Sequence, residues 1–344
     1  MFYLNSNRKR KVDCMNEQLK AALRDILLDR YGIDINRAKC HFSTQNYAFI
    51  FPGEPFMVRV SATPKKTRSE ILSELMWLDD LKQFKQTVCE PNVSLNGNLL
   101  EEFEIDGQMY RTSMFRTARG VIKETTDITP MFFICCGDLL GAIHHVSTDE
   151  REKGFKFMRG TKADDFAAMK ERVREKIPAD ILERINSIET KVAALSQDVG
   201  HYGLCHGDFH MNNFFVDENN VWVFDFDGCA YAHYLYDIAS FIQACFLRGY
   251  GAGKDLRTVM EEDILHYFKI GYTINKKCDE HFWDNLDLFM NYRTALTYMA
   301  LCEIDYVGVV EDTQKIKRFF GYLISQDDIM AAMTGAMKHM GAMV

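Results

Sequence analysis

The fold is decided by two short segments, Cys205-His-Gly-Asp-Phe-His-Met-Asn-Asn213 and Val223-Phe-Asp-Phe-Asp227. Between and around them lie two apolar runs, 213–216 and 221–226, separated by the turn-forming residues Asp217-Glu-Asn-Asn220. This pattern predicts a loop followed by a β-hairpin. One carboxylate therefore lies in the loop, an Asn follows it at the start of the hairpin, and a second carboxylate comes directly after the hairpin.

This order of side chains meets the demands of phosphoryl transfer. A carboxylate must orient the accepting hydroxyl, and oxygen ligands must hold the divalent cation that bridges the phosphates. Asp208 is the candidate base, and Asn213 and Asp225 are the candidate metal ligands. The competing interpretation is that these residues only cap turns and that Asp225 and Asp227 lie on an exposed strand end. Their joint spacing favours the catalytic interpretation.

Residues 204–240 resemble the catalytic core of the aminoglycoside phosphotransferase and choline/homoserine kinase superfamily. The shared pattern is H-G-D-x-H-x-x-N, then apolar-D-[FW]-[DE], then Y-D-[LI]-A, which here ends in Tyr234-Leu-Tyr-Asp237-Ile-Ala. The resemblance implies that Asp208 is the catalytic aspartate, braced by His206, and that Asp237 supports the loop. It also implies that Asn213 and Asp225 bind Mg²⁺.

Two details of the loop refine this resemblance. Gly207 and His210 stand where ordinary protein kinases carry Arg and Lys, and both match the superfamily. The family's Pro-Gly before the Asn is Met211-Asn212 in this chain. This departure should change the local backbone of the loop but not its ligands.

The whole chain predicts an α+β fold of the protein-kinase-like, two-lobed type. A disordered basic tail over 1–14 precedes an N-terminal nucleotide-binding lobe at 15–118, a small antiparallel sheet with a helix. A mainly helical catalytic and substrate-binding lobe follows at 119–344. Helical spacing is predicted at 15–31, 70–84, 127–147, 162–177, 179–198, 234–248, 255–273 and 280–307, and strands at 47–51, 56–60, 99–105 and 108–115.

In the N-terminal lobe, Arg59 lies on the predicted strand where protein kinases carry the phosphate-binding Lys, and a guanidinium can bind phosphate bidentately. As the partner of Arg59 on the next predicted helix, Glu74 fits better than Glu70, although the two glutamates lie one helical turn apart. No Gly-rich loop is present, so hydroxyl side chains and backbone N–H groups would have to cover the phosphates. The remaining candidate nucleotide contacts are Ser43, Thr44 and Asn46 in the loop and Met114, Phe115 and Arg116 at the hinge.

The acceptor is expected to bind near Asp208 in the helical lobe. Acidic and aromatic side chains there suit a cationic acceptor such as an amino sugar, whereas Arg293 suggests contact with an anion. The sequence leaves both possibilities open. The candidate substrate residues are His210, Asp227, Trp283, Tyr292, Arg293, Glu303 and Tyr306.

Composition narrows the functional classes. The formal net charge of -8 and the pI of about 5.7 argue against a nucleic-acid partner. No run approaches 18 apolar residues and no signal peptide precedes the first helix, so neither a membrane nor secretion is expected. The ten cysteines show no C-x-x-C spacing, which favours reduced thiols in the cytoplasm. His144 and His145 end an apolar helix and are interpreted as structural rather than metal-binding.

Three functions remain open from the sequence. The favoured one is a kinase that moves the γ-phosphoryl of ATP or GTP, with Mg²⁺, to a hydroxyl of an aminoglycoside, an amino alcohol or a similar small metabolite. It would act as a monomer or a homodimer. A protein Ser/Thr kinase is disfavoured because Asp225 runs almost directly into Tyr234-Leu-Tyr-Asp237, without an activation segment. A catalytically silent nucleotide-binding module is disfavoured because the base and both metal ligands are present.

Overall fold

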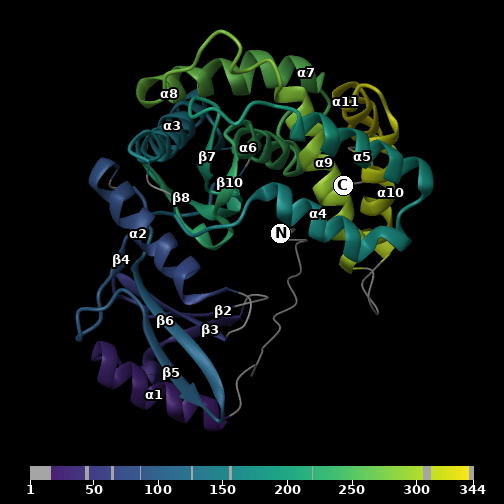
Figure 1. The fold of residues 1–344 in the computed structure, drawn as a ribbon. Coiled ribbons are helices and arrows are strands. Elements are labelled where there is room, and N and C mark those ends of the chain that lie inside the picture. The colour runs from purple at the N-terminus through teal and green to yellow at the C-terminus, as the bar shows by residue number, and fades with distance from the viewer. Residues whose placement is uncertain are drawn as a thin grey trace. The chain divides into compact units, whose positions relative to one another are not determined.

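The computed structural model describes residues 17–42, 46–62, 66–85, 87–124, 127–154, 157–218, 220–304 and 311–340. The chain divides into two compact units, which Figure 1 shows as a sheet-containing part and a mainly helical part. Unit 1 comprises Met1–Asp79 and Cys89–Thr117, and unit 2 comprises Asp80–Val88 and Ala118–Val344. The predicted fold class, a small antiparallel sheet followed by a larger helical region, is confirmed.

Unit 1 is built on a six-stranded antiparallel sheet with the order β1-β2-β3-β6-β4, in which β5 also pairs with β6. Its strands are β1 Lys39–Phe42, β2 Asn46–Ile50, β3 Phe56–Ala62, β4 Pro91–Asn92, β5 Glu101–Ile105 and β6 Gln108–Arg116. The four longer strands agree with the sequence prediction to within a few residues. β1 and β4 were not predicted, because strands this short carry little periodic signal.

The helices α1 (Glu17–Tyr31) and α2 (Arg68–Phe84) contact opposite faces of β3 in this sheet. Val58 and Val60 of β3 are buried in one cluster with Leu23 of α1. Arg59 lies between the two valines and points to the other face, because side chains alternate along a strand. Its partner there is Glu74 of α2.

Unit 2 consists mainly of helices and carries two small β-ribbons. Its helices are α3 Pro130–Glu152, α4 Lys162–Val173, α5 Ala179–Ala193, α6 Leu235–Leu247, α7 Leu256–Thr258, α8 His266–Asn275, α9 Leu286–Ile304, α10 Glu311–Ser325 and α11 Ile329–Met340. A π-helical segment at Val259–Leu265 joins α7 to α8. α10 and α11 lie beyond the last helix that the sequence predicted.

α3 and α8 pack unusually closely. A Cβ added at Gly137 would lie 2.1 Å from the carbonyl oxygen of Phe268, and one added at Gly271 would lie 1.9 Å from that of Ile134. Only glycine permits this approach of two backbones. α3 is long and apolar enough to cross a membrane by length and composition, but 67% of its most apolar window is buried inside the fold. It is therefore a core helix of unit 2.

The two ribbons of unit 2 frame the segment that decides the fold. β7 (Tyr202–Cys205) pairs with β10 (Ala230–His233), and β8 (Phe214–Asp217) pairs with β9 (Asn220–Val223). The sequence predicted the β8–β9 hairpin with a second run reaching residue 226. The strand ends at Val223 instead, because Asp225 adopts a left-handed backbone (φ 65°) that turns the chain into a short 3₁₀ helix.

Candidate active site

The loop after β7 is closed by a side chain from its own end. Asn213 donates its amide N–H to the backbone carbonyl of Asp208 at 2.9 Å and, at 3.4 Å, to the Asp208 carboxylate. His210 caps the short helical turn Met211–Asn213 by accepting the N–H of Asn212. Because the amide nitrogen of Asn213 holds the loop, its amide oxygen is the atom that can face a cation.

Asp208 is poised as an ionised carboxylate. Its side chain is 32% exposed, and His210 Nε2 lies 3.2 Å from its Oδ2. Burial acts to raise the pKa of Asp208, but the hydrogen bond and charge of His210, with a smaller contribution from Arg293, lower the pKa from its ordinary value. A carboxylate of low basicity is suited to orient the acceptor hydroxyl, because phosphoryl transfer requires little proton abstraction before the transition state.

The two predicted metal ligands are brought side by side by the hairpin. The N–H of Phe224, the residue before Asp225, donates to the carbonyl of Asn213 at 3.0 Å. Asp225 has a positive φ although it does not lie in a hairpin turn. The other two described non-glycine residues with positive φ, Asp106 and Glu218, both lie in hairpin turns. Carboxylate and amide oxygens are the kinds of ligand that a hard divalent cation prefers.

His206 links the loop to the metal-ligand segment. Its Nδ1 accepts the N–H of Asp208 at 3.2 Å, so Nε2 carries the proton and donates to the carbonyl of Phe224 at 3.1 Å. Burial lowers the pKa of this fully buried imidazole, which keeps it neutral. The His206 side chain therefore fixes the position of Asp208 relative to Phe224, the residue before Asp225, which is a positioning role.

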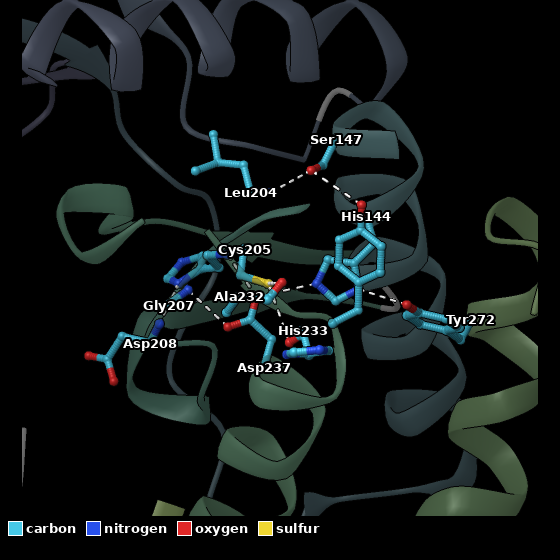
Figure 2. A network of polar contacts seen from close by, with 12 residues as sticks. His144, Ser147, Leu204, Cys205, Gly207, Asp208, Ala232, His233, Asp237 and Tyr272 are labelled. Carbon is cyan, nitrogen blue, oxygen red and sulfur yellow. Dashed lines mark hydrogen bonds and ion pairs between the residues drawn. The ribbon is translucent and has the colours of Figure 1, made fainter. Parts of the chain in front are cut away.

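Asp237 on α6 supports the same loop from behind, as Figure 2 shows. Its Oδ2 accepts the N–H of His206 at 2.7 Å and its Oδ1 accepts that of Gly207 at 2.8 Å. Gly207 has φ +82°, and a Cβ there would lie 2.1 Å from the carbonyl oxygen of Gly228. The glycine is therefore required, and the supporting role that the resemblance implied for Asp237 is confirmed by these contacts.

The network continues into the core through His144. Its Nε2 donates to Asp237 at 3.3 Å and its Nδ1 accepts the hydroxyl proton of Tyr272 at 2.7 Å. The ligand atoms of His144, Asp237 and Cys205 lie within 4.8 Å of one another, a proximity that the sequence spacing did not reveal. Each is already engaged, since the Cys205 thiol contacts the carbonyls of Ala232 and His233. The cluster is a satisfied hydrogen-bond network.

Two residues beside Asp208 were missed by the sequence analysis. Lys162, the first residue of α4, lies so close to Gly207 that its Cε would be 2.8 Å from a Cβ there. Tyr236 accepts a hydrogen bond from Arg293 Nη1 at 2.7 Å, and the charge of Arg293 acts on Asp208. No local pattern marks Lys162, which reaches the loop only because α4 follows a backbone bridge between Thr161 and Tyr231 of β10.

In unit 1, Arg59 and Glu74 form a bidentate ion pair. The Nη1–Oε1 and Nη2–Oε2 distances are 2.8 and 3.2 Å, and both side chains are almost fully buried. The guanidinium also lies 4.8 Å from the centre of the Phe115 ring. Glu70, the alternative partner, accepts the N–H of Thr67 and caps α2, so Glu74 is the residue that pairs with Arg59.

The other described nucleotide candidates lie at the ends of two interior strands of the same sheet. Asn46 begins β2 opposite Ser61, and Met114 to Arg116 form the last residues of β6. Unit 1 ends directly afterwards at Thr117. Ser43 and Thr44 lie outside the described residues.

The candidate substrate residues do not all gather at Asp208. Arg293 and His210 lie beside it, and Tyr292 donates to the carbonyl of Lys162 at 3.2 Å. Trp283 packs against Tyr272, which lies on the far side of Asp237 from Asp208 (Figure 2). Glu303 is held elsewhere, in an exposed ion pair with Arg172. The backbone carbonyl of Asp227 accepts from Arg159, and the next residue, Gly228, lies close to Asp208, because a Cβ at Gly228 would be 3.8 Å from the Cβ of Asp208. Tyr306 lies outside the described residues.

Comparison with known proteins gives a family match over most of the chain. Residues 35–261 match the model of the phosphotransferase enzyme family. The amicoumacin kinase of Bacillus subtilis (strain 168) is 22% identical over 292 residues, which cover 83% of this chain and 86% of that protein.

Solved structures share the fold at low sequence identity. One is the amicoumacin kinase hAmiN in complex with AMP-PNP, Ca²⁺ and Ami, with a TM-score of 0.79, 20% identity, and coverage of 92% of this chain and 95% of that chain. Another is a microcompartment-associated aminopropanol kinase, with a TM-score of 0.60, 17% identity, and coverage of 94% and 98%. These likenesses extend over nearly the whole fold.

Proposed function

The chain belongs to the phosphotransferase enzyme family, and from that premise we propose that it is a small-molecule kinase. It would transfer the γ-phosphoryl group of ATP to a hydroxyl of a small acceptor of the amino alcohol or amino sugar kind. The observation that carries the proposal is the set of hydrogen bonds that connects Asp208 to the residue before Asp225. Asn213 and His206 each bond to Asp208, and both also bond to Phe224, the residue before Asp225.

In this mechanism Asp208 orients the acceptor hydroxyl for in-line attack on the γ-phosphorus. The new P–O bond forms with the acceptor oxygen, the bond to the β-phosphate oxygen breaks, and the hydroxyl proton passes to Asp208 and on to solvent as ADP leaves. A divalent cation held by Asn213 and Asp225 would neutralise the phosphate oxygens. Positioning and electrostatics supply most of the rate gain in such transfers.

The nucleotide phosphates would be bound in unit 1 by Arg59. The buried bidentate ion pair with Glu74 fixes the orientation of the Arg59 guanidinium. The proposal of a divalent cation, Mg²⁺, and of ATP as the donor is supported by the ligand set and by the similar amicoumacin kinase structure, which carries AMP-PNP and Ca²⁺. A cytoplasmic location fits the cysteines, since every cysteine in the described ranges is a free thiol.

A protein substrate is disfavoured by the short connection after the metal-ligand segment. From Val223 at the end of β9 the chain passes through one 3₁₀ turn and β10 and enters α6 at Leu235. All of this connection is described, and β10 is paired with β7. It therefore contains no long activation segment of the kind that positions peptide substrates in protein kinases.

The test is a coupled assay of ADP release with Mg²⁺ and either ATP or GTP, run against amino alcohols, amino sugars, sugars, hydroxy acids and a generic protein. One small hydroxyl compound should stimulate turnover, with the phosphorylated product identified by mass spectrometry. Asp208→Ala should lower kcat by about 10²–10⁴-fold and retain nucleotide binding by calorimetry. Asp180→Asn, an exposed carboxylate on α5, is the matched control.

Near-normal turnover in Asp208→Ala would show that another group performs the role assigned to Asp208. Stimulation by the protein acceptor alone would replace the small-molecule assignment. If no acceptor stimulates turnover although Mg²⁺–ATP binds, the kinase proposal fails in favour of a silent nucleotide-binding module.

A further inference from the structure

Two cationic side chains converge on Tyr236 next to Asp208. Lys162 Nζ lies 5.7 Å and Arg293 Cζ lies 5.1 Å from the centre of the Tyr236 ring. The stem of Lys162 runs against Gly207, the residue before Asp208. A lysine from α4 and an arginine from α9 therefore share one phenol at the proposed acceptor-orienting residue.

Lys162 and Arg293 place two positive charges beside the single carboxylate of Asp208, which interacts electrostatically with both. The ion pair of Lys162 is with Asp165 at 3.4 Å, and the side chain of Asp165 is 64% exposed, so water weakens the attraction. Arg293 donates to the neutral hydroxyl of Tyr236, and its Nε is buried without a hydrogen-bond partner among the described residues. A buried guanidinium donor left unpaired is costly.

Other buried arginine side chains of this chain have hydrogen-bond acceptors among its own residues. Arg59 has both carboxylate oxygens of Glu74, and Arg159 has the carbonyls of Cys229 and Asp227. Among the described contacts, Arg293 donates to Tyr236, and Oδ2 of Asp208 is engaged by His210. An anion supplied from outside the chain would complete the Lys162–Arg293 pair.

We propose that Lys162, Arg293 and the Tyr236 hydroxyl form a subsite for an anionic oxygen group of the acceptor, a carboxylate or a phosphate monoester close to the hydroxyl that is phosphorylated. The subsite deepens the proposed kinase function and rests on it. The anionic group is bound and stays chemically unchanged, while the neighbouring hydroxyl receives the phosphoryl group. The proposed metal ligands Asn213 and Asp225 flank the β8–β9 hairpin, so the nucleotide phosphates would have their own partners.

The experiment compares acceptors in matched pairs with the full-length enzyme, Mg²⁺ and ATP. The pairs are homoserine with 3-aminopropan-1-ol, glycerate with glycerol, and glucuronate with glucose, and glycerol 3-phosphate forms the phosphate arm. The wild-type enzyme should show a higher kcat/KM for the anionic member of at least one pair. The arm that responds identifies the anionic group as carboxylate or phosphate.

Arg293→Gln should then reduce the ratio of kcat/KM values, anionic over neutral, by about 10- to 100-fold, the range for a charged hydrogen bond. Lys162→Gln should reduce it in the same direction, and Arg293→Lys should retain part of it. Thermal melts establish that each variant is folded. Arg184→Gln, on the exposed surface of α5, should leave the ratio unchanged.

The outcomes separate the inference from the function. If the enzyme phosphorylates only neutral or cationic acceptors, the kinase function stands and the anionic subsite is refuted. An equal loss for both members of a pair, with weaker ADP binding, would reassign Lys162 and Arg293 to the nucleotide. Turnover of no acceptor at all would refute the proposed function itself, and the subsite with it.

Discussion

The carboxylate of Asp237 and the backbone N–H of Gly207 lie 2.8 Å apart, which joins α6 to the loop that carries Asp208. The other oxygen of Asp237 binds the N–H of His206. Burial acts to raise the pKa of Asp237, but His144, His206 and the Gly207 N–H outweigh it and lower the pKa. One fully buried carboxylate thus determines the conformation of the loop.

Asp237→Ala should destabilise unit 2 strongly. The substitution leaves two buried N–H groups and the His144 ring without their acceptor, and each unsatisfied group costs roughly 1–3 kcal/mol, so a loss of about 3–5 kcal/mol is expected. Urea denaturation with circular dichroism measures it. Asp237→Asn, which keeps one acceptor oxygen, should fall between the wild type and Asp237→Ala, and Asp263→Ala, at a partly exposed position, should have little effect. A loss below about 1 kcal/mol would contradict the structural role.

Stability should fall as the pH is lowered from 7 to 5. Burial lowers the pKa values of His144, His206 and His233, so below the unfolded value of about 6.5 the unfolded chain binds protons that the folded chain does not. Each histidine contributes a slope of up to about 1.4 kcal/mol per pH unit between its folded and unfolded pKa values. Denaturation midpoints across this pH range measure the sum.

His144→Gln should reduce that slope, whatever its effect on stability at pH 7. The exposed His281→Gln is the matched control and should leave the slope unchanged. A wild-type stability that is flat between pH 7 and 5 would show that these imidazoles do not remain neutral in the folded state.

Gly207→Ala should be far more damaging than Gly253→Ala. Both glycines have φ +82°, but a Cβ at Gly207 meets the carbonyl of Gly228 at 2.1 Å, whereas nothing lies within 4 Å of a Cβ at Gly253. The control therefore carries only the left-handed strain of about 1–2 kcal/mol, and Gly207→Ala adds a backbone clash. Thermal melting and kcat together should show a larger loss for Gly207→Ala; equal losses would mean that the loop relaxes freely.

The Arg59–Glu74 pair should show strong coupling. Glu74→Leu alone should cost about 3–5 kcal/mol, because it leaves a buried guanidinium uncompensated. The double variant Arg59→Met/Glu74→Leu should be less destabilised than either single variant. If Arg59 binds the nucleotide, Arg59→Met should also raise the Kd for Mg²⁺–ATP, and Arg59→Lys should restore part of the binding. Additive losses in the cycle would refute the coupling.

Asp225→Ala should weaken nucleotide binding only when a divalent cation is present. The carboxylate is proposed to bind the cation and not the nucleotide directly, so calorimetric titration of ATP with Mg²⁺, and again with EDTA, separates the two effects. Asn213→Ala should behave in the same direction. Asp217→Asn, an exposed position on the same hairpin, is the control. Identical affinity for Mg²⁺–ATP in Asp225→Ala and the wild type would remove Asp225 from the metal site.

The sequence predicted most of the order of helices and strands, because local residue patterns indicate these elements. Periodicity marked the longer helices and strands, and the turn residues 217–220 marked the β8–β9 hairpin. The proposed grouping of Asp208, Asn213 and Asp225 also came from the sequence, because a short loop separates the first two and a tight hairpin returns the chain from the second to the third.

Contacts between distant segments required the tertiary structure. The β7–β10 ribbon, the choice of Glu74 over Glu70 and the contact of Lys162 with Gly207 each join residues that no local pattern connects. The same holds for His144 and Tyr272, whose hydrogen bond depends on the close approach of α3 and α8 at glycine residues. Sequence by itself determined which residues carry the proposed chemistry, whereas packing decided which buried charges and N–H groups face one another, because those pairings depend on distances that only the folded core establishes.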